Sequence, residues 1–173
     1  MKCELNGAMT ALFFVEVADA QTELEEVKSA MPDLPLDVIP FPLSEAFQWW
    51  CEDKGTIVPT LAAIKAAGAP DGVEPLGQQV PFFACLEMQA ESKEGKPALP
   101  LFFVHAEAKE AMEMALAADE DTEENKVEET FKVVSLSLQR AVELLATVPS
   151  TPAFQFVTPV SSSQYVAGYL KSN

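Results

Sequence analysis

Few side chains in this sequence have a type and spacing that suit catalysis. The chain holds one histidine, His105, and three cysteines, Cys3, Cys51 and Cys85. A catalytic triad needs a base, and His105 is the one histidine for that role, but no GxSxG elbow or other nucleophile motif accompanies it. We therefore interpret His105 as a solvated residue at the end of a strand, and we expect a protein that is not an enzyme.

Metal and cofactor sites also find little support. The cysteines are odd in number and match no zinc spacing, so we predict buried free thiols rather than a disulfide or a metal site. The carboxylates between Asp119 and Glu129 lack the DxDxDG loop that calcium binding favours and predict a solvated acidic loop. None of the 7 glycines forms a phosphate-binding motif. We expect no cofactor and no metal.

Charge and hydropathy limit the partners. The 173-residue chain has 27 acidic and 11 basic residues, a net charge of -16 and an apolar share of 49%. This charge repels nucleic acids and anionic membrane surfaces. No apolar run approaches the roughly 20 residues of a transmembrane helix, and the N-terminus resembles neither a signal peptide nor a transit peptide. We predict a soluble or peripheral protein whose partners are other proteins, with any targeting segment absent from this chain.

One apolar pattern occurs twice in the chain. LDVIPFPLSEAFQWW matches FKVVSLSLQRAVELL at every apolar position. Such self-similarity predicts an internal duplication. We predict an α/β fold of two halves, residues 1–79 and 80–173, related by a pseudo-two-fold axis within one compact globular unit. The matched anchors are residues 36–50 with 131–145, 12–15 with 101–104, Pro59 with Pro159, and Gly68 with Gly168.

The predicted unit runs strand, strand, helix, strand, helix, strand, helix, as a mixed sheet with helices packed on it. Asp19 is expected to cap the first helix, and Ser44 and Ser137 to open two shorter helices. LDVIPFPL and FKVVSLSL alternate as strands, the former short or at an edge because Pro40 and Pro42 cannot donate ladder hydrogen bonds. The side chains predicted to point inward are Phe14, Val38, Phe41, Phe103, Val133 and Leu136.

The second half begins with an additional strand. VPFFACLEMQ and ALPLFFV predict a hairpin whose turn uses Gly95. The equivalent of VPFFACLEMQ in the first half would precede Met1, so we predict that the first half lacks its opening strand. Its sheet edge at residues 11–17 would then be free to recruit another chain.

Two adjacent tryptophans lie on one predicted helix. Residues of a helix are about 100° apart, so Leu43, Ala46, Phe47 and Trp50 form the stripe that faces the core. Trp49 lies outside this stripe and either packs beneath the segment that follows or contributes to an exposed apolar patch that binds a partner. The candidate partner-binding residues are Trp49, its counterpart Leu144, and Leu12 and Phe13 of the strand edge.

The chain resembles the Tic22 family over most of residues 11–171. The resemblance rests on VPFFACLEMQ, KPALPLFFVHAEAKEAMEMA, FKVVSLSLQRAV and PAFQFVTPVSSSQYVAGYL. In that family a Val-Pro strand leads to a hairpin, an aromatic pair and a helix that often opens with Asp-Ala. The positions that fit are Asp19 and Ala20, Val133 to Leu136, and Phe156 with Pro159.

The resemblance implies a non-enzymatic, chaperone-like protein that binds precursors during plastid import, in the intermembrane space of the chloroplast envelope. The negative charge suits the basic, acid-poor transit peptides of such precursors. The alternative is a structural subunit of a larger plastid assembly, such as a thylakoid photosystem or antenna complex, that docks through apolar surface and an unpaired strand edge.

Overall fold

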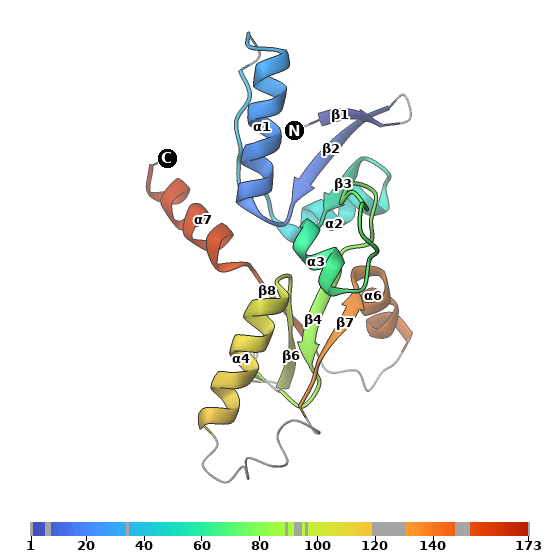
Figure 1. Cartoon of the computed structure of the whole chain (residues 1–173), viewed down its shortest axis with the longest axis vertical. Helices are drawn as coiled ribbons and strands as arrows, with labels where there is room; N and C mark the ends of the chain where they lie inside the picture. The colour runs from blue at the N-terminus through green and yellow to red at the C-terminus, as the bar shows by residue number, and fades with distance from the viewer. Residues whose placement is uncertain are drawn as a thin grey trace. The chain divides into compact units, whose positions relative to one another are not determined.

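Strands and helices alternate along most of the chain (Figure 1). The structure is a computed structural model and describes residues 2–5, 8–33, 35–88, 90–91, 95, 97–118, 131–147 and 153–172. It has the mixed α/β class that the sequence predicts. The elements are β1 Lys2–Leu5, β2 Ala8–Phe14, α1 Val17–Ala30, α2 Leu43–Cys51, β3 Gly55–Val58, α3 Leu61–Ala66, β4 Pro81–Cys85, β5 Ala90–Glu91, β6 Pro97–Phe102, α4 His105–Ala118, β7 Val133–Ser137, α6 Leu138–Thr147, β8 Ala153–Val157 and α7 Val160–Ser172.

The chain divides into two compact units, each with its own sheet. The first unit comprises residues 1–61, 72–78 and 160–173, and the second unit comprises residues 62–71 and 79–159. The units therefore differ from the continuous halves that the repeat predicts, because most of α3 groups with the second unit and α7 with the first. The duplication and its axis stay predictions.

The first unit has a three-stranded sheet in the order β1-β2-β3. Strand β2 pairs antiparallel with β1 and parallel with β3, with Leu12 opposite Thr56 and Phe14 opposite Val58. Helix α7 joins this unit through the Ser162 hydroxyl, which accepts a hydrogen bond from the Val17 amide at 3.1 Å. The expectation that no strand precedes β2 is wrong, since β1 occupies the edge of β2 along residues 8–11.

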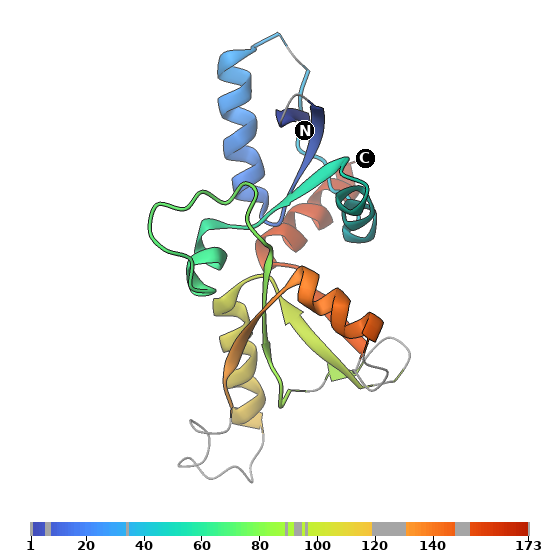
Figure 2. The same ribbon diagram turned by 90° about the vertical axis from the view of Figure 1, so that its right-hand side faces the viewer.

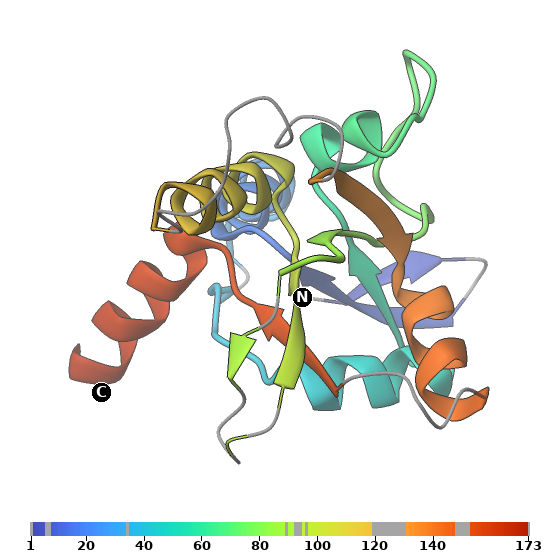
Figure 3. The same cartoon turned by 90° about the horizontal axis from the view of Figure 1, so that it is seen from below.

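The sheet of the second unit is built around β4 and β6. Strand β4 pairs antiparallel with β7 on one side and with β6 on the other, and β6 also pairs with β5 and, in parallel, with β8. All five residues of β4 are buried, as expected for an apolar run in the interior of a sheet. Helices α4 and α6 lie on opposite sides of these strands (Figure 3). The core cluster consists of Ala63, Phe83, Phe102 and Ala108, with Ala111, Val133 and Val157 packed against it.

The predicted hairpin of the second half is confirmed in its pairing. Strand β6 is antiparallel to β4 through Phe83 and Phe102 and antiparallel to β5. Gly95, between β5 and β6, has a positive φ of 72°, a conformation that glycine adopts without the steric cost of a Cβ. The remaining residues of the predicted turn lie outside the described residues.

Several local expectations need correction. Residues 36–42 form no strand, and α2 begins at Leu43 with Pro42 as its N-cap residue, so Ser44 lies inside the helix. Helix α1 begins at Val17, which places Asp19 in the first turn rather than at the cap. Ser137 is confirmed as the residue that opens α6, because its hydroxyl accepts a hydrogen bond from the Arg140 amide at 3.2 Å.

The predicted inward positions fall into three groups. Phe103 is buried in the second unit. Phe14, Val38, Val133 and Leu136 are half-buried. Phe41 is 37% exposed, so its assignment to the interior is wrong. Burial is thus weaker along residues 36–42, where the predicted strand is missing.

Candidate functional site

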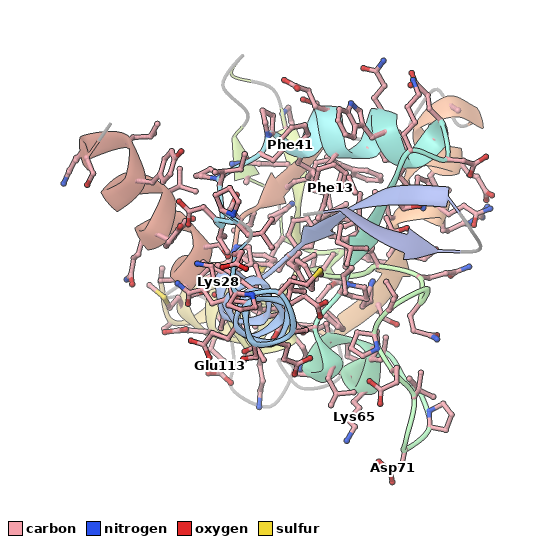
Figure 4. All side chains as sticks on the ribbon, turned by 90° about the horizontal axis from the view of Figure 1, so that it is seen from above. Phe13, Lys28, Phe41, Lys65, Asp71 and Glu113 are labelled. Carbon is pink, nitrogen blue, oxygen red and sulfur yellow. The ribbon has the colours of Figure 1, made fainter. Side chains whose placement is uncertain are left out.

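Three aromatic side chains from separate parts of the first unit form one cluster. Phe13 comes from β2, Phe41 from the segment before α2, and Trp49 from α2. The ring centroids of Phe13 and Phe41 are 4.8 Å apart, and Trp49 lies edge-on at 5.8 Å from Phe13 and 5.7 Å from Phe41. Figure 4 shows Phe13 and Phe41 side by side. We call these three residues the aromatic cluster.

Gly55 lets α2 and β2 approach each other at this cluster. A Cβ atom at this position would lie 2.5 Å from Cε2 of Phe13 and 3.3 Å from Cβ of Trp49. Such contacts are shorter than van der Waals distances, so a larger residue would displace the Phe13 ring. Glycine at the start of β3 therefore fixes how Trp49 packs.

The same region exposes large apolar side chains. Ile39 is 59% exposed, and Phe41 and Trp50 are each 37% exposed. Trp50 packs on one side against Phe47, with ring centroids 5.5 Å apart. Apolar side chains of this size in one short segment suit contact with another protein. We call Ile39, Phe41, Phe47 and Trp50 the apolar surface.

The structure corrects the predicted position of Trp50 and selects between the two alternatives for Trp49. Trp50 was expected in the core but is substantially exposed, whereas Trp49 is half-buried in the aromatic cluster. The cause is the contact with β3, since Ala46 and Trp49, one helical turn apart, turn toward the interior. Trp49 thus packs against the segment that follows α2, one of its two predicted positions. Apolar residues cover so wide an arc of α2 that the sequence alone did not determine which side of the helix faces the core.

The other candidate partner-binding residues are scattered. Leu12 is buried at 7% exposure in β2, beside Phe13 of the aromatic cluster. Leu144 is half-buried on α6 in the second unit. The structure brings Phe13 and Trp49 together but assigns Leu12 to the core and Leu144 to another unit. The exposed residues Ile39 and Trp50 were missed, although Pro40 and Pro42 could have indicated that Ile39 is exposed.

Comparison with solved structures identifies the architecture. Tic22 from Plasmodium falciparum matches with a TM-score of 0.67 and 16% identity, covering 100% of this chain and 88% of that one. Anabaena Tic22, described as a protein-transport protein, matches with a TM-score of 0.69 and 16% identity, covering 97% of this chain and 86% of that one. The chain has the Tic22 fold. Neither a protein-family model nor a curated protein matches the sequence.

On this Tic22 fold, His105 and Cys85 each contact a neighbouring side chain. His105 begins α4, with its ring edge-on to Phe83 at a centroid distance of 5.1 Å. The buried Cys85 thiol donates a hydrogen bond to Oε2 of Glu87 at 3.1 Å, and burial raises the pKa of this thiol. Cys51 is exposed, which corrects the expectation that it packs inside.

The described part of the Tic22 fold shows neither a group of metal-binding side chains nor a membrane-spanning helix. No three His, Cys, Asp or Glu residues there are grouped so as to hold a metal ion. No helix among the same residues is long and apolar enough to cross a membrane.

Proposed function

We propose that this protein is a non-enzymatic protein-transport factor of a plastid that binds polypeptides in transit. The observation that carries the proposal is the likeness to two Tic22 structures over nearly the whole chain, one of them described as a protein-transport protein. A role as a structural subunit of a photosynthetic complex has no comparable support. The bound polypeptides would be precursor proteins in an unfolded or extended form.

The apolar surface supplies contacts for such a ligand. Exposed aromatic side chains contribute strongly to protein interfaces, and Trp50 and Phe41 present rings that are already partly packed and so lose little entropy on binding. The net charge of -16 adds long-range attraction for basic, acid-poor segments. Together these features favour a chain that combines apolar and basic residues.

The two tryptophans of α2 offer a matched test. A fluorescently labelled short peptide with lysine, serine and leucine but no acidic residue serves as the probe, and binding is followed by anisotropy. Trp50→Ala should weaken binding by on the order of tenfold and cost only about 1 to 2 kcal/mol of stability, because its side chain is partly exposed. Trp49→Ala should instead destabilise the fold by about 2 to 4 kcal/mol, because it empties the aromatic cluster.

The control peptide replaces every leucine by serine and should bind more weakly than the probe. Absence of saturable binding by the leucine peptide would reject the proposed function. Equal binding by wild type and Trp50→Ala would remove Trp50 from the contact surface.

A further inference from the structure

Strand β7 forms one side of the sheet in the second unit. Among the described strands, β4 is the one that pairs with β7, so the opposite edge of β7 carries no described strand (Figure 2). Unpaired edges of this kind recruit extended chains unless they are blocked. The orientation of the amides along β7 determines what such a chain could meet.

The register shows which amides point outward. Pro81 lies opposite Ser137 and Phe82 opposite Leu136. The same register continues one step further, where the Leu138 amide donates to the Val80 carbonyl at 2.9 Å. In an antiparallel ladder, hydrogen-bonded and non-bonded pairs alternate.

Counting from the bonded pair of Leu138 and Val80, Leu136 and Val134 bond to β4. Ser137, Ser135 and Val133 fall on the alternate positions, so their N–H and C=O groups point to the open edge. The position of Pro81 is consistent with this alternation of bonded and non-bonded pairs. It lies opposite Ser137 in a non-bonded pair, where its missing N–H removes no hydrogen bond to β7.

A hollow lies over the paired ends of β4 and β7, within the second unit. It has a volume of about 210 Å³. Ser135 and Ser137 contribute to it from β7 and Ala67 from the residue that follows α3. Its further lining residues, Gln79, Pro81 and Leu136, make it a mixed polar and apolar site. A strand added beside β7 would project alternate side chains on the face where Ser135 and Ser137 lie.

We propose that the outer edge of β7 binds an extended, basic polypeptide segment as an added strand, with one of its side chains in this hollow. This inference rests on the proposed function and assigns it a second surface, separate from the apolar surface of the first unit. Main-chain hydrogen bonds to Val133 and Ser135 supply affinity that is independent of sequence. A factor that receives many different chains requires that property.

Charge decides between a foreign segment and a second copy of this chain. Two copies, each with a net charge of -16, repel one another as their edges approach. A basic segment is attracted by the same charge. The edge of β7 is therefore suited to basic chains and disfavours self-association.

Hydrogen exchange of the wild-type protein tests the pairing directly. The probe is a peptide of alternating lysine and threonine, and the control is the same peptide with every backbone amide methylated. Methylation keeps the charge but prevents strand pairing, because the N–H donors are lost and the methyl groups keep the peptide carbonyls away from the amides of β7. The probe should slow exchange of the Val133 and Ser135 amides by at least about tenfold. The amides of Val134 and Leu136, already bonded to β4, should change little, and the methylated control should protect none of them.

A pair of variants at one position tests the same edge. Ser135→Pro removes an outward N–H and is compatible with an edge strand, so it should weaken probe binding by about tenfold while the melting temperature stays close to that of wild type. Ser135→Ala keeps the N–H and changes only the side chain in the hollow, so it should weaken binding less than Ser135→Pro does. If Ser135→Pro fails to fold, the exchange pattern of the wild-type protein still decides.

Three results would overturn this inference alone. The first is binding of the probe without protection of the Val133 and Ser135 amides. The second is binding of the leucine peptide but not of the lysine-threonine probe. Both of these results leave the proposed function intact. The third is protection of these amides in a probe-free dimer, which would assign the edge to a second copy. Failure of both peptides to bind would reject the inference and the proposed function together.

Discussion

Residues 36–42 and residues 131–137 carry the same apolar pattern, but only the second segment forms a strand. Residues 133–137 pair along their whole length with β4, whereas residues 36–42 are without regular structure and end at the N-cap of α2. Pro40 and Pro42 lack the amide hydrogens that a ladder needs. An alternating pattern therefore yields a strand where a partner strand and free amides are both present.

The two segments differ in exposure for the same reason. Without a sheet to cover it, Ile39 is 59% exposed, against 38% for its matched residue Val134, and Phe41 is exposed whereas its matched residue Leu136 is half-buried. The paired segment is thus less exposed than the unpaired one, and it lies beside the fully buried Phe82 of β4. The variants below test this difference, from the largest expected effect to the smallest.

Truncating one phenylalanine in each unit should give unequal losses of stability. Phe82→Ala should lower the free energy of unfolding by about 3 to 5 kcal/mol, because the ring is fully buried and packs on Phe103 and Phe156. Phe41→Ala should cost less, about 1 to 2 kcal/mol, because its ring is partly in water. Urea denaturation of both variants measures the difference. Equal losses would mean that residue 41 is as much a part of a core as residue 82.

The matched glycines of the repeat should respond in opposite directions. Gly68 has a φ of +96° after α3, where the Gly68 amide bonds to the Lys65 carbonyl and the Ala69 amide to the Ile64 carbonyl, each at 2.9 Å. This Schellman arrangement requires the left-handed conformation, so Gly68→Ala should destabilise by about 1 kcal/mol. Gly168 lies inside α7 with open space around it, and Gly168→Ala should stabilise by about 0.5 to 1 kcal/mol.

Thermal unfolding of the two glycine variants checks the signs. If both variants lost stability by similar amounts, Gly168 would not be an ordinary helical position. A gain at Gly68 would contradict its role at the end of α3.

The two serines predicted to open helices make a further pair. Ser137→Ala removes the hydroxyl that accepts a hydrogen bond from the Arg140 amide and should cost about 1 kcal/mol. Ser44→Ala changes an exposed position inside α2, whose N-cap is Pro42, and should change stability by less than about 0.5 kcal/mol. Chemical denaturation of both variants measures this, and a larger cost at Ser44 would contradict the observed start of α2.

Sequence reasoning predicted the elements that depend on local pattern. The α/β class, the buried run of β4, the antiparallel pairing of β4 with β6 and the cap at Ser137 follow from apolar periodicity and residue type. The orientation of α2 could not be predicted in this way, because it depends on the contact of Trp49 with Gly55 from a different element. The grouping of α7 with the first unit likewise depends on contacts distant in sequence, such as Val17 with Ser162.

The smallest expected effect concerns Asp19, which the offset of 89 residues between the predicted anchors 12–15 and 101–104 aligns with Ala108. Ala108 is buried in α4, whereas Asp19 places a carboxyl group in the first turn of α1, where partial burial raises its pKa. A carboxyl group whose pKa is higher in the folded state than in the unfolded chain binds more protons when folded. Its contribution to stability is therefore most favourable below the unfolded pKa of about 3.9 and is lost as the pH rises through the folded pKa.

Asp19→Asn removes this titration while keeping the shape of the side chain. At neutral pH the variant should be slightly more stable than wild type, by a few tenths of a kcal/mol, since most of the carboxyl group remains in water. This advantage should shrink as the pH falls toward about 3.9, where the wild-type carboxyl group is protonated. Denaturation curves of both proteins across this range measure the difference and cancel the titration of the other carboxylates. A variant that is less stable at neutral pH would show that the carboxylate favours the N-terminus of α1 more than burial disfavours it.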